Sequence, residues 1–173
     1  SIEITSQFSD HVTIKAAQSG GARFNDIDFN GASHVTLDGV VVQEQVRALN
    51  SDNISYYDSQ FNGGIYYREA SEIHVESSDI ANGTHGVTLN YVDGFTLRDN
   101  VIHAARSDLV RVVSSNYGEI VNNELRDVHP TADDHADGIQ FGGWLGETPH
   151  DVVVRGNYIH DDRSTGDATY GMQ

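Results

Sequence analysis

A short hydrophobic pattern recurs along most of this chain, and it leaves few folds open. Each copy has two apolar residues separated by one position, followed by a third apolar residue seven positions after the first. Successive copies start 19, 19, 22, 23 and 34 residues apart. The copies are Val35/Leu37/Val42, Ile54/Tyr56/Phe61, Ile73/Val75/Ile80, Phe95/Leu97/Ile102, the weaker Gly118/Ile120/Leu125, and Val152/Val154/Ile159.

A second apolar pair precedes each copy in a nearly fixed phase. Its second member stands six residues before the copy in every case but the last, where it stands eleven before. Hairpin strands would reverse direction and lose this phase, whereas in a parallel solenoid each repeat forms one coil and equivalent residues stack ~4.8 Å apart. The pairs are Ile27/Phe29, Val46/Ala48, Ile65/Tyr67, Val87/Leu89, Val110/Val112 and Ile139/Phe141.

The residues around these pairs are typical of strands and turns. Gly, Asn, Asp and Ser are frequent, and Val and Ile occur in short runs such as "DVVVRGNYI". We therefore predict an all-β, single-domain parallel solenoid of about seven coils over residues 1–173. A polar residue two positions before the last apolar residue of five coils predicts a stacked turn, since Asn tolerates left-handed angles and can bond to the next coil. These residues are Ser59, Ser78, Asn100, Asn123 and Asn157.

The stretch "HADGIQF" at 135–141, followed by "HDVVVRGNYIHDD" at 150–162, carries a resemblance. It resembles the repeat of the right-handed parallel β-helix in the pectate-lyase-like superfamily, which includes secreted polysaccharide lyases, epimerases and phage tailspikes. The resemblance covers nearly the whole chain. It implies the fold more specifically than the activity, because this fold carries many functions.

Both ends of the chain have coil-like sequence without an amphipathic capping helix, and "YGMQ" at 170–173 resembles the start of another coil. Because solenoids need capped ends, we expect part of a longer chain or assembly.

The charge of the chain excludes two classes of partner. The formal net charge is −16, from 26 acidic and 10 basic residues. Such a chain repels phosphate backbones and anionic lipid, so we expect neither nucleic acid nor a membrane as partner. The absence of cysteine excludes a disulfide scaffold and thiol chemistry.

Loop lengths predict where a site lies. From the last apolar residue of one coil to the next first strand, the distances are 4, 4, 7, 8, 14 and 13 residues. Long loops on a rigid scaffold commonly carry function, so we expect a groove over the outward side chains of the first strands. These side chains are Asp28, Arg47, Tyr66, Thr88, Arg111 and Gln140, and His85, Asp108 and Asp137 stand two positions before their pairs.

The residue types in this groove fit chemistry on an acidic sugar. Elimination or epimerisation of a uronate needs a cation at the carboxylate, a base for the C5 proton, and an acid. Arg111 or Arg47 could neutralise the uronate carboxylate. His85 or His135 could be the base, and Tyr66 could be the acid. Hydrolysis would instead need two carboxylates flanking the bond, and Asp108 and Asp137 share a phase on adjacent coils. We predict catalytic roles for His85, Asp108, Arg111, His135 and Asp137, and substrate binding by Arg47, Tyr66, Gln140 and Trp144.

Simpler interpretations of the same residues stay open. Arg111 and Asp108 could form a surface ion pair, and His85 and Asp137 could be turn residues. Trp144 could cover the apolar end of a loop.

A cation site is a further interpretation of the acidic loops. Hard cations bind several carboxylate oxygens, so calcium is a candidate cofactor. The candidate ligands are Asp133, Asp134, Asp161 and Asp162. A zinc site from His129, His135 and His150 depends on loop geometry.

Two functions remain open at this point. The first is a secreted polysaccharide-active module, which as an enzyme would be a lyase, epimerase or glycoside hydrolase. The second is a non-enzymatic tailspike, tail-fibre or adhesin β-helix, on a virion or cell surface, that binds a glycan receptor or serves as a rigid stalk. A homotrimer or larger assembly would fit the second function.

Overall fold

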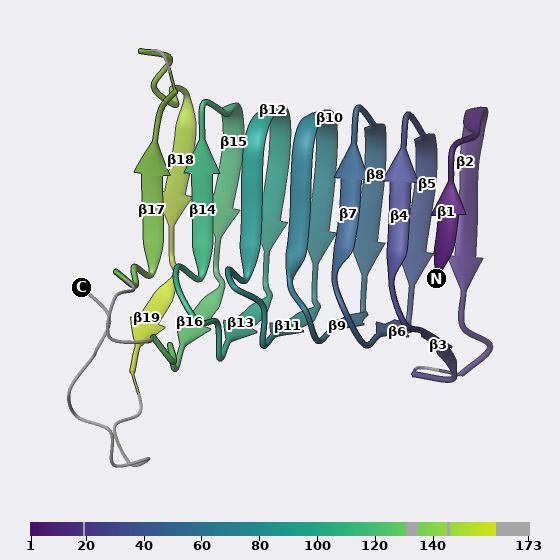
Figure 1. The fold of residues 1–173 in the computed structure, drawn as a ribbon, viewed down its shortest axis with the longest axis horizontal. Helices are drawn as coiled ribbons and strands as arrows, with labels where there is room; N and C mark the ends of the chain where they lie inside the picture. The colour runs from purple at the N-terminus through teal and green to yellow at the C-terminus, as the bar shows by residue number, and fades with distance from the viewer. Residues whose placement is uncertain (19, 131–134, 145, 162–173) are drawn as a thin grey trace.

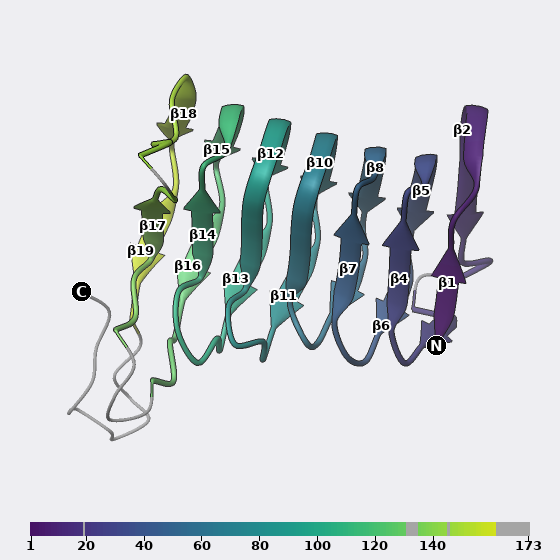
Figure 2. The same ribbon diagram turned by 45° about the horizontal axis from the view of Figure 1, so that its top comes forward.

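The computed structural model describes residues 1–18, 20–130, 135–144 and 146–161. In this part of the chain there is no helix, and all paired strands of the coils run parallel. The chain winds as a right-handed solenoid, rising through a first sheet, descending through a second, and crossing a shorter third (Figure 1). The predicted all-β parallel solenoid is therefore confirmed. Turned by 45°, the coils follow one another in order along one axis (Figure 2).

Each coil contributes one strand segment to each sheet. Because β10 and β12 run without a break from the first sheet into the second, these two form one continuous 12-stranded sheet, and the third is a separate 7-stranded sheet. The first sheet contains β1 (Ile2–Ile4), β4 (Ile27–Asn30), β7 (Val46–Leu49), β10 (Ile65–Glu76), β12 (Val87–Arg98), β14 (Val110–Val113) and β17 (Ile139–Gly142). The second contains β2 (Gln7–Lys15), β5 (Ser33–Asp38), β8 (Asp52–Tyr57), β15 (Asn116–Val121) and β18 (Val152–Arg155), with the second halves of β10 and β12. The third contains β3 (Ala22–Phe24), β6 (Val40–Val42), β9 (Gln60–Phe61), β11 (Asp79–Ala81), β13 (Val101–His103), β16 (Glu124–Arg126) and β19 (Tyr158–His160).

The repeating apolar residues form the interior of the solenoid. Pairing joins equivalent members of successive coils, for example Val87 with Val110 and Leu89 with Val112, and all four side chains are fully buried. Aromatic rings fill the middle coils, where Tyr56 lies 6.0 Å from both Phe29 and Tyr67 between ring centroids. The predicted inward register is thus confirmed across the three sheets.

The strands of the last described coil pair in the predicted register, but several of their inward residues are exposed. Phe141 pairs with Val112, as the repeat predicts, yet 46% of its surface is exposed. Val154 and Ile159 are exposed for the same reason, since no strand within the described residues covers this coil. The predicted inward register therefore holds at Phe141, but at this end of the described coils an inward position is not a buried one.

The polar turn residues form a hydrogen-bonded ladder at the corner between the second and third sheets. Asn123 Oδ1 accepts the backbone N–H of Asn100 at 3.0 Å, and Asn157 Oδ1 accepts that of Asn123 at 2.9 Å. Ser59 and Ser78 continue the ladder with their hydroxyls. One detail differs from the sequence-based expectation: the left-handed backbone belongs to the residue before each ladder position, such as Asp99 (φ 52°) and Asn122 (φ 56°).

Candidate functional site

The outward residues of the first strands form one continuous row across the sheet. Register pairing joins neighbours in the order that the sequence predicts, with Arg111 between Thr88 and Gln140. Because neighbouring strands lie ~4.8 Å apart, the row is a straight track on which successive units of a polymer could lie. Its members are Glu3, Asp28, Arg47, Tyr66, Thr88, Arg111 and Gln140.

His85 and Asp108 form the inner part of a polar cluster where β12 and β14 begin. His85 Nδ1 lies 3.3 Å from Asp108 Oδ2, and the carboxylate is almost fully buried. This contact is close enough for an ion pair, although its angle is not that of a hydrogen bond. The other carboxylate oxygen, Oδ1, accepts the backbone N–H of Asp137 at 3.1 Å. Asp108 is therefore a buried carboxylate that holds two neighbouring coils together and faces one imidazole.

Arg111 lies against the opposite side of this imidazole. Its Nη1 is 3.5 Å from His85 Nε2, and its Nε is buried with no hydrogen-bond partner among the described residues. Because a guanidinium has only donors, the His85 nitrogen that faces it acts as the acceptor, and the proton is then on Nδ1, which faces Asp108. The described carboxylates form no ion pair with Arg111, so the alternative of an Arg111–Asp108 surface pair is not what the structure has.

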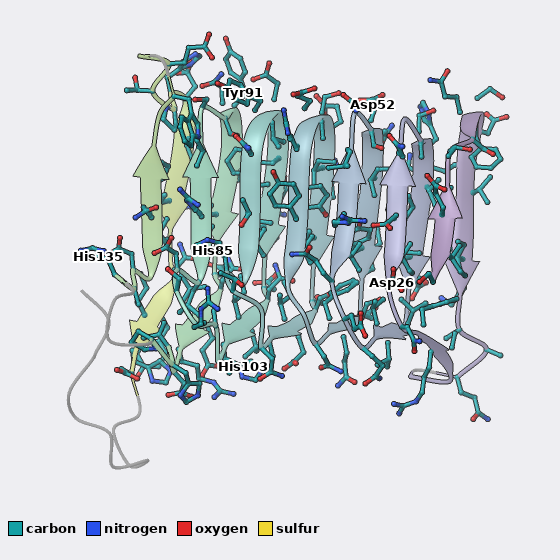
Figure 3. The ribbon with its side chains drawn as sticks, viewed as in Figure 1. Asp26, Asp52, His85, Tyr91, His103 and His135 are labelled. Atoms are coloured by element: carbon teal, nitrogen blue, oxygen red, sulfur yellow. The ribbon has the colours of Figure 1, made fainter. Side chains whose placement is uncertain are left out.

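The loop that begins the last first-sheet strand adds three more polar groups. Asp137 Oδ2 lies 3.3 Å from His135 Nδ1 and accepts from Gln140 Nε2 at 3.2 Å. Ser107 Oγ donates to the carbonyl oxygen of His135 at 3.2 Å and fixes the loop. His85 and His135 accordingly lie at the same end of the first sheet (Figure 3).

The five predicted catalytic residues are thus brought together, on three neighbouring coils. His85 and His135 each face a carboxylate, and a guanidinium lies between their coils. Such an arrangement can take up a proton at one imidazole, hold a negative charge at Arg111, and deliver a proton from a second imidazole. The buried carboxylate of Asp108 can orient His85 without contacting a ligand itself.

Arg47 and Tyr66 belong to a different part of the row. Tyr66 lies two coils from Arg111, roughly 10 Å away along the track, which separates the predicted acid from the predicted neutralising cation. Asp28 forms a bidentate pair with Arg47 at 2.7 and 2.9 Å, and this hydrogen bonding is the main cause that raises the pKa of the guanidinium. A pocket of about 350 Å³ opens beside them, lined by Arg47, Leu49, Asn50, Tyr66, Arg68 and Glu69.

Arg68 is a residue that the sequence argument missed. It follows its inward pair by one position, so strand alternation also turns its side chain outward. Only the residue inside each pair was considered, although the residue after the pair forms a second outward column with Leu49 and Asn90. Strand alternation in the repeat would therefore have predicted Arg68 as an outward residue beside Arg47 and Tyr66.

Trp144 lies at the far end of the same strands. Its backbone N–H donates to Ser114 Oγ at 3.1 Å, and its indole is 57% exposed. It does not join the His85 cluster, which lies where the strands begin. The idea that Trp144 covers the apolar end of a loop is not supported by so exposed a side chain.

Three of the four candidate calcium ligands, Asp133, Asp134 and Asp162, lie outside the described residues, while Asp161 is described and half-buried. Within the described ranges, no group of three or more His, Asp or Glu side chains could hold a metal ion. Calcium therefore stays a prediction. The described part of the chain also contains no helix of the length and hydropathy that crossing a membrane requires.

A family model described as "Right handed beta helix region" matches residues 27–171. The chain belongs to this right-handed β-helix family. No curated protein matches the chain by sequence.

Solved structures share the β-helix fold with this family member. PfbA, a surface adhesin of Streptococcus pneumoniae, is similar with a TM-score of 0.71 and 11% identity, over 88% of this chain and 51% of that chain. The chain thus spans about half the length of that structure. A protein of Parabacteroides merdae ATCC 43184 that is inferred to be a glycosyl hydrolase gives a TM-score of 0.63 and 10% identity, over 94% of this chain and 85% of that chain.

The A-module of the mannuronan C-5 epimerase AlgE4 from Azotobacter vinelandii is also similar. Its TM-score is 0.50 with 16% identity, over 88% of this chain and 57% of that chain. At these identities the likeness concerns the fold, so the roles of individual side chains must be argued from the site.

Proposed function

We propose that this β-helix binds an acidic polysaccharide along its first sheet and abstracts the C5 proton of a uronate unit. The observation that carries the proposal is the contact of Arg111 with His85, beside the buried carboxylate of Asp108. Arg111 forms no ion pair with the described carboxylates, so its positive charge favours a ligand that supplies a carboxylate. A uronate is such a ligand.

The proposed roles follow from the geometry. Arg111 pairs with the uronate carboxylate and stabilises the negative charge that develops when the C5–H bond breaks. When Arg111 turns to the uronate carboxylate, His85 Nε2 is released from Arg111 and accepts that proton, while Asp108 acts as a positioning residue that stabilises the imidazolium. In elimination the C4–O4 bond then breaks, a C4=C5 double bond forms, and His135, held by Asp137, gives a proton to O4. In epimerisation His135 instead gives a proton to C5 on its opposite face.

Hydrolysis has less support than these two reactions. It would need Asp108 and Asp137 to flank the glycosidic bond, one of them as an acid. Asp108 is almost fully buried, and its Oδ1 is occupied by the backbone of Asp137. The cluster therefore favours a lyase- or epimerase-like reaction.

The test is incubation of the protein with a panel of polyuronates in D₂O. Absorbance of the unsaturated product reports elimination, and deuterium at C5, measured by NMR, reports epimerisation. We expect His85→Asn and Arg111→Ala to lower the rate by roughly 10²-fold or more, the usual contribution of a positioned acid–base group. Arg98→Ala is the matched control, because Arg98 forms a cross-coil pair with Glu119 at 2.9 Å on the second sheet. An active protein that tolerates both site substitutions would contradict the assignment of the site.

A non-enzymatic glycan-binding module is the second candidate. It is favoured by the likeness to the adhesin PfbA, which has the higher TM-score of the three similar structures. In this case calorimetry would detect polyuronate binding that Arg111→Ala weakens, with no elimination and no exchange at C5. A protein that neither binds nor modifies any polyuronate would overturn both candidates for this site.

An extracellular or surface location fits both candidates, as does a homotrimer for the adhesin. The similar proteins include a surface adhesin, and a polysaccharide partner is commonly met outside the cell. Light scattering on the purified protein would test the trimer.

A further inference from the structure

A second polar pocket lies at the opposite end of the first-sheet strands, where β17 is followed by the loop to β18. This loop is at the top left of the solenoid (Figure 1). The pocket has a volume of about 470 Å³ and is lined by Ser114, Asn116, Gly146, Glu147, Thr148 and His150. The His85 cluster lies where β14 begins, and the pocket lies where β14 ends. Because β14 has four residues and a strand rises ~3.3 Å per residue, the two places are roughly 13 Å apart. One sugar unit could not fill both places.

The protein holds this pocket in a fixed shape by hydrogen bonds to the neighbouring coil. Ser114 Oγ accepts from the backbone N–H of Trp144 at 3.1 Å and donates to the carbonyl oxygen of Glu147 at 2.9 Å. Asn116 Oδ1 accepts the backbone N–H of His150 at 3.1 Å. These bonds occupy Ser114 and the acceptor of Asn116. Among the described side chains, none is hydrogen-bonded to the carboxylate of Glu147 or the hydroxyl of Thr148, so both are open to a ligand.

Two exposed aromatic residues are direct neighbours of residues that line the pocket. Tyr117 is 61% exposed, and its ring meets that of His150 edge to face with centroids 5.3 Å apart. Trp144, the single tryptophan of the chain, pairs with Glu147 in an antiparallel bridge. Tyr117 also has a left-handed backbone (φ 56°), which is uncommon for a bulky side chain. Aromatic faces next to hydroxyl and carboxylate groups provide both apolar contact and hydrogen bonds for a sugar ring.

The charge of this pocket differs from that of the first-sheet row. Glu147 lines it, Asp151 is bonded to His150 at 2.9 Å, and Asp93 is bonded to Asn116 at 3.1 Å. The described residues that line it include no lysine or arginine, so an acidic sugar would be repelled. We infer that the pocket is a second carbohydrate site, which takes an uncharged, hydroxyl-rich sugar unit. This site is distinct from the acidic-glycan site and does not depend on it.

The experiment uses Trp144 as a built-in reporter, because the chain has one tryptophan. Uncharged tetrasaccharides of glucose, galactose and mannose are titrated while indole fluorescence and heat of binding are recorded. At least one of them should change the fluorescence and bind. Tyr117→Asn, which keeps a residue suited to the left-handed backbone, and Thr148→Ala should each weaken binding at least ~10-fold, about 1.4 kcal/mol.

Two controls separate this site from the alternatives. Tyr158→Ala removes an equally exposed ring, 65% accessible, from the third sheet and should leave binding unchanged. Arg111→Ala should also leave it unchanged, whatever its effect on polyuronates. The inference is overturned if no uncharged tetrasaccharide binds, if Tyr158→Ala weakens binding as much as Tyr117→Asn, or if binding is lost in Arg111→Ala.

Discussion

The side-chain amide of Asn100 donates to Asn123 Oδ1 at 3.0 Å, and the same oxygen accepts the backbone N–H of Asn100 at 3.0 Å. Asn123 Nδ2 in turn donates to the carbonyl oxygen of Leu97 at 2.9 Å and to Asn157 Oδ1 at 2.9 Å. One buried side chain therefore satisfies groups on two neighbouring coils.

Replacing Asn123 by Ala should leave the backbone N–H and the side-chain amide of Asn100 without their acceptor. Because each unsatisfied buried group costs about 1–3 kcal/mol, we expect a loss of about 2–4 kcal/mol in the free energy of unfolding. Urea denaturation measures this loss. Asn62→Ala, which removes a surface amide with one long contact of 3.5 Å, is the control and should change stability by less than about 0.5 kcal/mol. Equal effects of the two substitutions would contradict the importance of the ladder.

Gly118 stands where the other copies of the repeat have a larger apolar residue. Its partner on the preceding coil explains why a glycine is found there. Phe95 pairs with Gly118, and a Cβ on Gly118 would overlap with the Phe95 ring. Gly118→Ala should therefore destabilise the fold by about 1–3 kcal/mol, the usual cost of overpacking. Phe95→Leu in the same chain should recover part of the loss. Gly142→Ala is a matched control, because a Cβ there meets nothing within 4 Å. Thermal unfolding of the parent and these three variants separates the outcomes.

The repeat predicted most of the fold, because strand alternation is a strict geometric rule. Pairing of Arg111 with Gln140 follows from it directly, as does the shared end of His85 and Asp137. Alternation gives no information on how side chains fill space, so it could not show that Gly118 makes room for Phe95. It also could not foresee that Phe141, with correct register, is left half exposed.

The sequence predicted which residues lie at the candidate site, but it did not predict which of their side chains contact one another. Asp108 was predicted as a catalytic residue, with a surface ion pair to Arg111 as the alternative, yet it is buried and faces His85. Tyr66 was grouped with Arg111 because the two residues share the outward column, whereas two coils separate them along it. The position of a residue in a column predicts its order along the sheet and the face to which its side chain points. The side-chain rotamers decide which neighbouring side chains contact one another.

Val112 tests the register at a fully buried position. Val112→Asp would place an unpaired carboxylate in the apolar interior, at a cost that consumes much of the about 5–15 kcal/mol by which domains are stable. We expect loss of the cooperative unfolding transition in circular dichroism. Val153→Asp puts the same charge on the outward face of the second sheet, at a half-exposed residue, and should fold normally. A Val112→Asp protein with unchanged melting would refute the register.

Calcium is tested by melting curves, because a ligand that binds only the folded state stabilises it. If Asp133, Asp134, Asp161 and Asp162 hold calcium, millimolar calcium should raise the melting temperature and a chelator should lower it. Alanine at Asp161 should remove the response, while alanine at the exposed Asp10 on β2 should keep it. Identical curves with calcium and with chelator would remove the hypothesis.

The last prediction concerns Asp137, through which the loop at 135–144 reaches the candidate site. Its carboxylate contacts His135 and Gln140, and both contacts lie outside the apolar interior. Asp137→Ala should free the His135 ring and the Gln140 amide without creating a cavity, so the melting temperature should change little. Polyuronate turnover, or binding if the protein is not an enzyme, should fall roughly 10-fold or more, because a reacting group that is no longer positioned loses much of its contribution. Asp10→Ala is again the control. If Asp137→Ala binds and turns over the polyuronate like the parent, Asp137 is a turn residue, and the glycan does not reach the end of the sheet where His85 and His135 lie.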